Sequence, residues 1–296
     1  MLTFLKNIQF LLTGLLVLVQ IDASGQDDTL APKPLSSIPR DERTLSTIPD
    51  KAYFKSWLTD GRDIAISPYR WNKYQWIAFS GVTVATALLF TQDAYIQKVV
   101  QKNQNPFMDN AAKYGLERLG SGLYTLPALG LLYGVGAILK NDKARYTALK
   151  GFEAYVLGFV SAQVLKQLTH RHRPYQDDPP NPFLWDGPLG MFSKGAFHPF
   201  SNSSFPSGHS TVVFAIATVV ATSYTRTVWV PIVCYTFAGL TAASRVYQND
   251  HWFSDVFAGA ALGFAIGRTI MNNHIKKLKV LPISHTGVGV MLIYQL

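Results

Sequence analysis

Three short clusters of lysine, arginine, histidine and aspartate give this sequence the chemistry of a phosphate-binding site. Each cluster lies at the end of an apolar stretch. Fixed guanidinium and ammonium groups bind the oxygens of a dianion such as phosphate, and a histidine beside a carboxylate can act as a nucleophile or carry a proton. The clusters are Lys166 with Arg173-Pro174, Pro206-Ser207-Gly208-His209, and Ser244-Arg245 with His251 and Asp255.

The second cluster predicts a tight turn that leads into a helix. Pro206 and Gly208 favour the turn, and the apolar run from Val212 onward favours the helix. The N–H groups of Ser207 and Gly208 would then lie at the helix N-terminus, where the positive end of the helix dipole attracts an anion. We therefore expect a phosphate cradle here, with the imidazole of His209 beside it.

The third cluster pairs a histidine with a carboxylate. His251 and Asp255 are four residues apart, so on a helix they would share one face. The carboxylate could accept one ring N–H and leave the other ring nitrogen free to attack. This is the arrangement of a nucleophile and its orienting group in covalent catalysis.

All three clusters match, in order and spacing, the signature motifs of the type 2 phosphatidic acid phosphatase (PAP2) superfamily. The sequence resembles that superfamily from about residue 75 to residue 270. Its members include lipid phosphatases, bacterial class A acid phosphatases and vanadium haloperoxidases. The resemblance implies an all-α fold, a six-helix bundle of the PAP2/haloperoxidase type, and it favours the bacterial membrane lipid phosphatase branch.

The resemblance also implies a role for each residue. His251 would attack phosphorus and become a phosphohistidine, with Asp255 fixing its tautomer. His209 would protonate the leaving alcohol and then activate water. No metal and no cofactor would be needed, because cations supply the electrostatic stabilisation. The phosphate clamp would consist of Lys166, Arg173, Ser207, Gly208 and Arg245.

Composition points to a membrane rather than to nucleic acid. The chain has 296 residues, of which 48% are hydrophobic and 15% charged, and its formal charge is +9. Soluble proteins carry about 25% charged residues. A basic balance suits anionic lipid surfaces or phosphate substrates, and the sequence contains no recognisable nucleic-acid motif. The single Cys234 excludes an intrachain disulfide.

Uncharged apolar runs place the helices that carry the clusters. The first two runs are long enough to cross a bilayer core of about 30 Å, and the others are shorter or interrupted by charge. A stripe of Gly259, Gly263 and Gly267, and a second of Gly130 and Gly134, would allow close helix contact. We therefore predict a transmembrane bundle of six helices, at residues 74–92, 119–139, 146–165, 210–225, 227–244 and 256–267.

The flanking regions differ in composition from the bundle. Residues 1–25 resemble a secretory signal peptide, and residues 26–70 predict a linker that ends in a short amphipathic helix with Tyr53, Phe54, Trp57 and Leu58 on its apolar side. The phosphatase domain would cover residues 71–272, and residues 273–296 would form a tail with a lipid-headgroup patch at Lys276, Lys277 and Lys279. The proline-rich loop 171–206 would cover the site.

The predicted function is hydrolysis of a lipid phosphate ester or diphosphate. The substrate would be an anionic phospholipid or an isoprenoid phosphate. One alternative is a periplasmic acid phosphatase acting on small phosphate esters, which a secretory leader and a mean hydropathy of only +0.11 would fit. A vanadate-dependent haloperoxidase and a lipid-binding protein with a degenerate site are further alternatives.

Membrane topology is left open by the sequence. If the leader is cleaved, six spans would place the site in the cytoplasm. The resemblance implies instead the inner membrane of a bacterial cell envelope with an extracytoplasmic site, which is the interpretation we favour.

Overall fold

The computed structural model describes residues 47–188, 190, 203–273, 279–283 and 289–293. The predicted signal peptide, most of the predicted linker, Lys276, Lys277 and the middle of the loop 171–206 lie outside these residues. The predictions made for them stay predictions.

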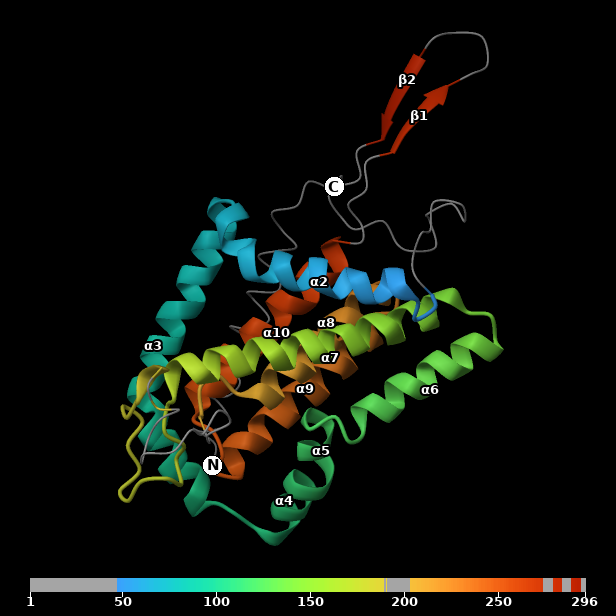
Figure 1. The fold of residues 1–296 in the computed structure, drawn as a ribbon. Coiled ribbons are helices and arrows are strands. Elements are labelled where there is room, and N and C mark those ends of the chain that lie inside the picture. Colours follow the sequence, from blue (N-terminus) through green and yellow to red (C-terminus); the bar gives the residue numbers. More distant parts are fainter. Residues whose placement is uncertain (1–46, 189, 191–202, 274–278, 284–288, 294–296) are drawn as a thin grey trace.

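Helices form nearly all of the described structure, which confirms the all-α prediction, and each predicted apolar run falls in a helical region. Two short antiparallel strands follow, with Lys279 opposite Ile293, and extend away from the helices in Figure 1. The elements are α2 (Lys51–Ile66), a 3₁₀ turn (Ser67–Arg70), α3 (Lys73–Lys102), α4 (Pro106–Asn110), a π-helical turn (Ala111–Leu116), α5 (Glu117–Gly120), α6 (Thr125–Ile138), α7 (Asp142–Thr169), α8 (Gly208–Ser223), α9 (Trp229–Tyr247), α10 (Phe253–Asn273), β1 (Lys279–Ile283) and β2 (Gly289–Ile293).

Helix α8 lies at the centre of the bundle and packs against α7, α9 and α10 (Figure 1). Most of its side chains are buried, as its unbroken apolar sequence requires. Two hydrophobic clusters surround it. One contains Val212, Ala215 and Val219 with Ile266 and Ile270, and the other contains Phe214 and Ala217 with Ala238, Ala242 and Val256.

Glycines bring α10 directly onto the backbone of α8. A Cβ atom added at Gly263 would lie 2.1 Å from the carbonyl oxygen of Thr211, and one at Gly267 would lie 2.6 Å from that of Ala215. The structure therefore confirms the close contact expected of this stripe. The second stripe makes no such contact, because a Cβ at Gly130 or Gly134 would meet no described atom within 4 Å.

The predicted span at residues 119–139 is broken. Helix α5 ends at Gly120 and α6 begins at Thr125, and the two helical segments are bent by 55°. Gly122 makes the turn with φ +86°, and a Cβ there would lie 2.6 Å from the hydroxyl oxygen of Tyr155. Both observations require glycine at this position.

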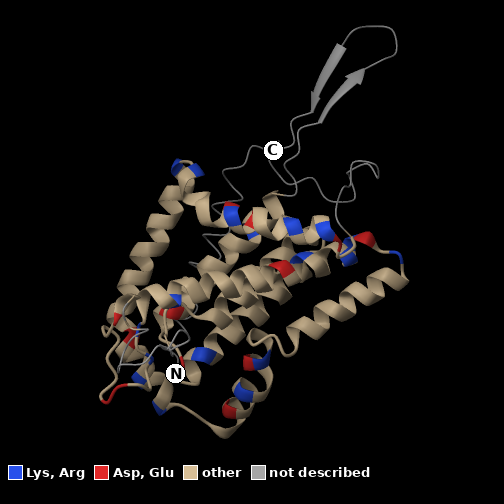
Figure 2. Cartoon of the chain, viewed as in Figure 1, with Lys and Arg blue, Asp and Glu red and all other residues tan. Residues whose placement is uncertain are grey.

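Two helices of the described chain, α3 and α10, are long and apolar enough to cross a membrane, and the bent pair of α4–α5 with α6 could form a third crossing. The middle of α3 and the whole of α6 carry no charge, as Figure 2 shows. Large apolar side chains also face outward on α3, α6, α7 and α9, among them Leu88, Ile138, Leu168 and Phe237. These surfaces fit a lipid environment.

Helix α2 buries only part of the apolar side that its sequence predicts. Phe54 and Leu58 are exposed, whereas Tyr53 and Asp60 are buried. The hydroxyl of Tyr53 donates to the carbonyl of Leu149 at 2.7 Å. This hydrogen bond joins α2 to α7, Ile64 packs against the core, and Phe54 and Leu58 face outward.

A buried charged cluster strengthens this contact between α2 and α7. The Lys150 Nζ atom lies 2.6 Å from Glu153 Oε2 and 3.6 Å from Asp60 Oδ2. The Asn273 Nδ2 group of α10 donates to Asp60 Oδ1 at 3.0 Å. We refer to Asp60, Lys150, Glu153 and Asn273 as the α2 anchor.

Candidate active site

The last turn of α7 supplies the first cation. Lys166 is buried, and its Nζ donates to the carbonyl oxygens of Ser203 and Ser204, the latter at 3.2 Å. Burial and the nearby charge of Arg173 lower the pKa of Lys166 to about 7. The ammonium group is therefore held in place, but its positive charge is not balanced by nearby negative charge. An added anion would stabilise the charged form of Lys166.

The second cluster begins α8, as its sequence predicts. Ser207 is the N-cap, and its hydroxyl accepts from the Ser210 N–H. The Ser207 N–H donates to the carbonyl of Asp255 at 3.0 Å. We expected this N–H group to bind phosphate, but it is already used. The N–H groups of Gly208 and His209 remain at the open end of the helix, where no earlier helical carbonyl can accept them. The backbone part of the phosphate cradle therefore consists of the Gly208 and His209 N–H groups, one residue later than the predicted pair.

The imidazole of His209 packs against Gly120, a contact that the sequence analysis missed. A Cβ at Gly120 would lie 2.5 Å from the Cδ2 atom of His209, so only glycine leaves room for the ring. Burial, together with the charges of Arg245, Arg173 and Lys166, lowers the pKa of His209 to about 3. In the protein without ligand this ring is neutral at pH 7.

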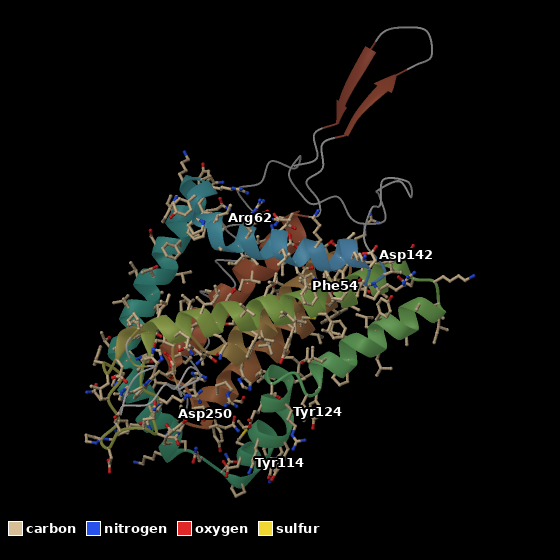
Figure 3. The ribbon with its side chains drawn as sticks, in the orientation of Figure 1. Phe54, Arg62, Tyr114, Tyr124, Asp142 and Asp250 are labelled. Atoms are coloured by element: carbon tan, nitrogen blue, oxygen red, sulfur yellow. The ribbon has the colours of Figure 1, made fainter. Side chains whose placement is uncertain are left out.

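Two arginines complete the set of cations. Arg245, at the end of α9, donates to Gln248 Oε1 at 2.7 Å and to Asp250, and its Nη1 lies 3.7 Å from Glu117 Oε2. Arg173 Nη1 lies 3.7 Å from Asp250 Oδ1. Asp250 therefore bridges the two guanidinium groups at the end of α9, where Figure 3 labels it.

His251 does not meet Asp255 directly, contrary to our expectation. His251 precedes α10, and its Nδ1 lies 3.7 Å from Asp255 Oδ2, beyond a hydrogen bond. Ser204 lies between them. Its Oγ is 3.3 Å from His251 Nδ1, and its hydroxyl donates to Asp255 Oδ2. Burial and the charges of Lys166, Arg173 and Arg245 lower the pKa of His251 well below its usual value.

The structure thus brings all three clusters together, and it adds residues that sequence analysis missed. Ser204 lies close to a motif, but nothing in its type marks it as a partner of His251. Asp93 gave a clearer signal, because it is the only acidic residue of α3 and ionisable groups in apolar helices are often functional. The residues missed are Asp93, Glu117, Gly120, Arg171, Ser204 and Asp250.

Three nitrogen atoms of this site are buried without a hydrogen-bond partner in the described part of the chain. They are Arg173 Nε, His209 Nε2 and Arg245 Nε. Buried polar groups are nearly always paired, so the set would accommodate an oxyanion. Within the described ranges, no group of three or more histidine, cysteine, aspartate or glutamate side chains could hold a metal ion.

Part of the chain is similar in sequence to known proteins. Residues 148–279 match the PAP2 superfamily. A lipid A 1-phosphatase of Porphyromonas gingivalis is 41% identical over 81 residues, which cover 26% of this chain and 18% of that protein. A lipid A 1-phosphatase of Rhizobium etli is 36% identical over 118 residues, covering 38% of this chain and 44% of that protein. The chain therefore spans less than two thirds of the curated relatives that it matches.

The crystal structure of a transmembrane PAP2 type phosphatidylglycerolphosphate phosphatase from Bacillus subtilis has a TM-score of 0.46 and 21% identity, and the match covers 75% of this chain and 94% of that one. All three clusters, from Lys166 to Asp255, fall inside residues 148–279, the region that matches the PAP2 superfamily.

Proposed function

We propose that this protein hydrolyses the phosphate ester of a membrane lipid through a phosphohistidine intermediate. The unpartnered nitrogens of Arg173, His209 and Arg245 carry this proposal. They come from a loop, from α8 and from α9. A phosphate group would supply the acceptors that these nitrogens lack.

The first step transfers phosphate to His251. Its Nδ1 faces Ser204, so Nε2 is the nitrogen left to attack phosphorus. The bond from phosphorus to the leaving oxygen breaks as the bond from Nε2 to phosphorus forms. His209 Nε2 gives its proton to the leaving oxygen, and the cations stabilise the negative charge on the other phosphate oxygens.

The second step reverses the role of His209. Now neutral, it accepts a proton from water, the water oxygen attacks phosphorus, and the bond between phosphorus and His251 breaks. With a pKa of about 3, His209 is neutral at pH 7, so it can accept a proton in this step but has none to give in the first. A bound dianion would offset the charges of Arg245, Arg173 and Lys166, raise the pKa of His209 and let it enter the first step protonated.

A lipid is the best-supported substrate class. Candidate membrane helices and outward-facing apolar side chains place the bundle in or against a bilayer. The curated relatives named above carry the name lipid A 1-phosphatase. We therefore place the phosphate of a lipid A-type sugar first among the substrates, ahead of phosphatidylglycerophosphate, phosphatidate and isoprenoid diphosphates.

The test is phosphate release by the purified protein in detergent, without added metal. The panel holds a lipid A 1-phosphate, phosphatidylglycerophosphate, phosphatidate, undecaprenyl diphosphate and p-nitrophenyl phosphate. We expect the lipids to be turned over well above the soluble ester, with lipid A first. A preference for p-nitrophenyl phosphate would contradict a lipid substrate, and no release from any compound would contradict the phosphatase itself.

We also propose that the site faces the extracytoplasmic side of a bacterial inner membrane. Pro180 is exposed in the loop next to the site. A Pro180→Cys substitution in a Cys234→Ala background should react with a membrane-impermeant thiol reagent in intact cells whose outer membrane is permeabilised. Labelling only after lysis would place the site in the cytoplasm.

A further inference from the structure

Arg171 carries a fully buried charge that the proposed reaction does not use. Its side chain is 0% exposed. The Nε and Nη2 groups donate to the carbonyl of Pro182 at 3.0 and 2.8 Å, and Nη2 also donates to Asp93 at 2.8 Å. Nη1 donates to Ser254 at 2.7 Å and to Asp255 at 2.5 Å. All five guanidinium N–H donors are thereby used.

Aromatic rings close the rest of the space around this guanidinium. The ring centroids lie 4.5 to 5.6 Å from its central carbon, and they belong to Phe90, Trp185 and Trp252. None of its N–H groups is left to bind a phosphate. Arg171 can therefore influence the reaction only through the residues that it holds.

The residue that it holds most directly is Asp255, whose two carboxylate oxygens have separate partners. Oδ1 accepts from Arg171. Oδ2 accepts from the backbone N–H of Trp252 at 2.9 Å and from the hydroxyl of Ser204, which leads on to His251. The direction in which Ser204 and His251 are held therefore depends on the rotation of one carboxylate.

Asp93 fixes the orientation of Arg171 and, through it, the rotation of the Asp255 carboxylate. Its carboxylate binds the other edge of the guanidinium, and it accepts from the N–H of Ser254 at 3.0 Å and from the Ser254 hydroxyl. Arg171 is thus fixed between α3 and α10, and it cannot turn to follow Asp255. Asp255 itself is 0% exposed, and its buried carboxylate is paired with this guanidinium.

We propose that Arg171 is a positioning residue for the nucleophile. By fixing the carboxylate of Asp255, it holds the Ser204 hydroxyl against Nδ1 of His251 and points Nε2 of His251 at the phosphate. This inference rests on the proposed function, in which His251 is the nucleophile.

Kinetics of two variants test the proposal, with p-nitrophenyl phosphate and the best lipid as substrates. We expect kcat to fall about 100-fold in Arg171→Gln and about tenfold in Arg171→Lys, which keeps the charge. KM should change less than about threefold, because the phosphate clamp is untouched. Arg145→Lys is the matched control. Arg145 lies on α7, and its Nη1 is 3.3 Å from Asp142, so this variant should keep wild-type kinetics.

A second measurement does not depend on turnover. Nitrogen-15 NMR of labelled histidines, with His251 assigned by its loss in His251→Gln, reports which ring nitrogen carries the proton. We expect the Nδ1–H tautomer in the wild type, and a mixture of tautomers in Arg171→Gln. If the Arg171 variants do not fold, Asp93→Asn should shift kcat and the tautomer in the same direction by a smaller amount.

Two results would overturn the proposal. In one, folded Arg171→Gln protein keeps the wild-type kcat and the Nδ1–H tautomer. In the other, Lys and Gln variants lose kcat, substrate affinity and thermal stability equally, which indicates a structural role alone. If the wild type releases no phosphate from any substrate, the proposed function fails, while the tautomer measurement still decides the role of Arg171.

Discussion

The two ends of α7 carry buried clusters of charged residues, and the two clusters differ in which hydrogen-bonding partner is missing. Near its start, the α2 anchor places two carboxylates, Asp60 and Glu153, around the single cation Lys150, and Glu153 Oε1 has no hydrogen-bond partner among the described residues. At its end, Lys166 belongs to a site whose unpartnered atoms are nitrogens. One cluster lacks a donor, and the other lacks an acceptor.

This difference indicates what each end does. The α2 anchor joins α2, α7 and α10, and a single proton shared between its carboxylates would complete its hydrogen bonding. The site at Lys166 joins a loop with α7, α8 and α9, and only an anion would complete it. Buried charge alone therefore does not identify a catalytic site. A group of buried hydrogen-bond donors that lack acceptors, contributed by several segments of the chain, does identify one.

Removing the proposed nucleophile is the strongest test of the difference between the active site and the α2 anchor. We expect His251→Gln to lower kcat about 10⁴-fold or more and to leave the melting temperature unchanged or higher, since His251 is held neutral among cations. Phosphate release and a thermal melt measure both effects. Turnover within tenfold of the wild type would exclude His251 as the nucleophile.

The opposite outcome is expected at the α2 anchor. Lys150→Met leaves two buried carboxylates without their cation and should cost about 3–5 kcal/mol of unfolding free energy. The kcat/KM of the folded protein should not change. Denaturant unfolding in detergent measures the loss, and the double variant Lys150→Met/Glu153→Leu should recover much of it. A loss of activity without a loss of stability would refute the contrast.

A smaller effect is expected from removing one cation of the clamp. Arg173→Gln should reduce kcat/KM about 100-fold without lowering stability, because it relieves repulsion with Lys166 and Arg245. The exposed Arg62→Gln serves as the control. Equal losses of activity in both variants would mean that Arg173 has no specific role.

The smallest effect concerns pH. Because the pKa of Lys166 is lowered to about 7, binding of sulfate, a dianion throughout this range, should weaken up to about tenfold for each pH unit above 7. Lys166→Arg should remove this dependence. The unfolded chain keeps the Lys166 proton up to about pH 10.5 and the folded chain does not, so unfolding free energy should rise between pH 7 and 10.5.

The pattern of the sequence predicted the helices and the convergence of three clusters. Helical apolar runs and the Pro-Ser-Gly turn are local signals, and Ser207 caps α8 where that turn predicts it. The break at Gly122 was missed because the apolar run continues through it. A positive φ and the approach of Tyr155, which lies 33 positions further along the chain, decide that break.

The supporting residues of the site could not be predicted, because they come from distant parts of the chain. Asp93, Arg171 and Ser204 are brought to Asp255 by the packing of α3 and of the loop on α10. The same folding uses the Ser207 N–H for Asp255. Spacing within a motif states which residues belong together, but not which of them touch.

The glycine contact between α8 and α10 has a consequence for how this protein can vary. His209 lies in the first turn of α8 and Asp255 in the first turn of α10, and the helices meet backbone to backbone at Gly259, Gly263 and Gly267. Because no side chain separates them, their register does not depend on the volume of any neighbouring residue. The outer surface could therefore drift to suit different lipids or membranes while the spacing of the reacting groups is inherited unchanged.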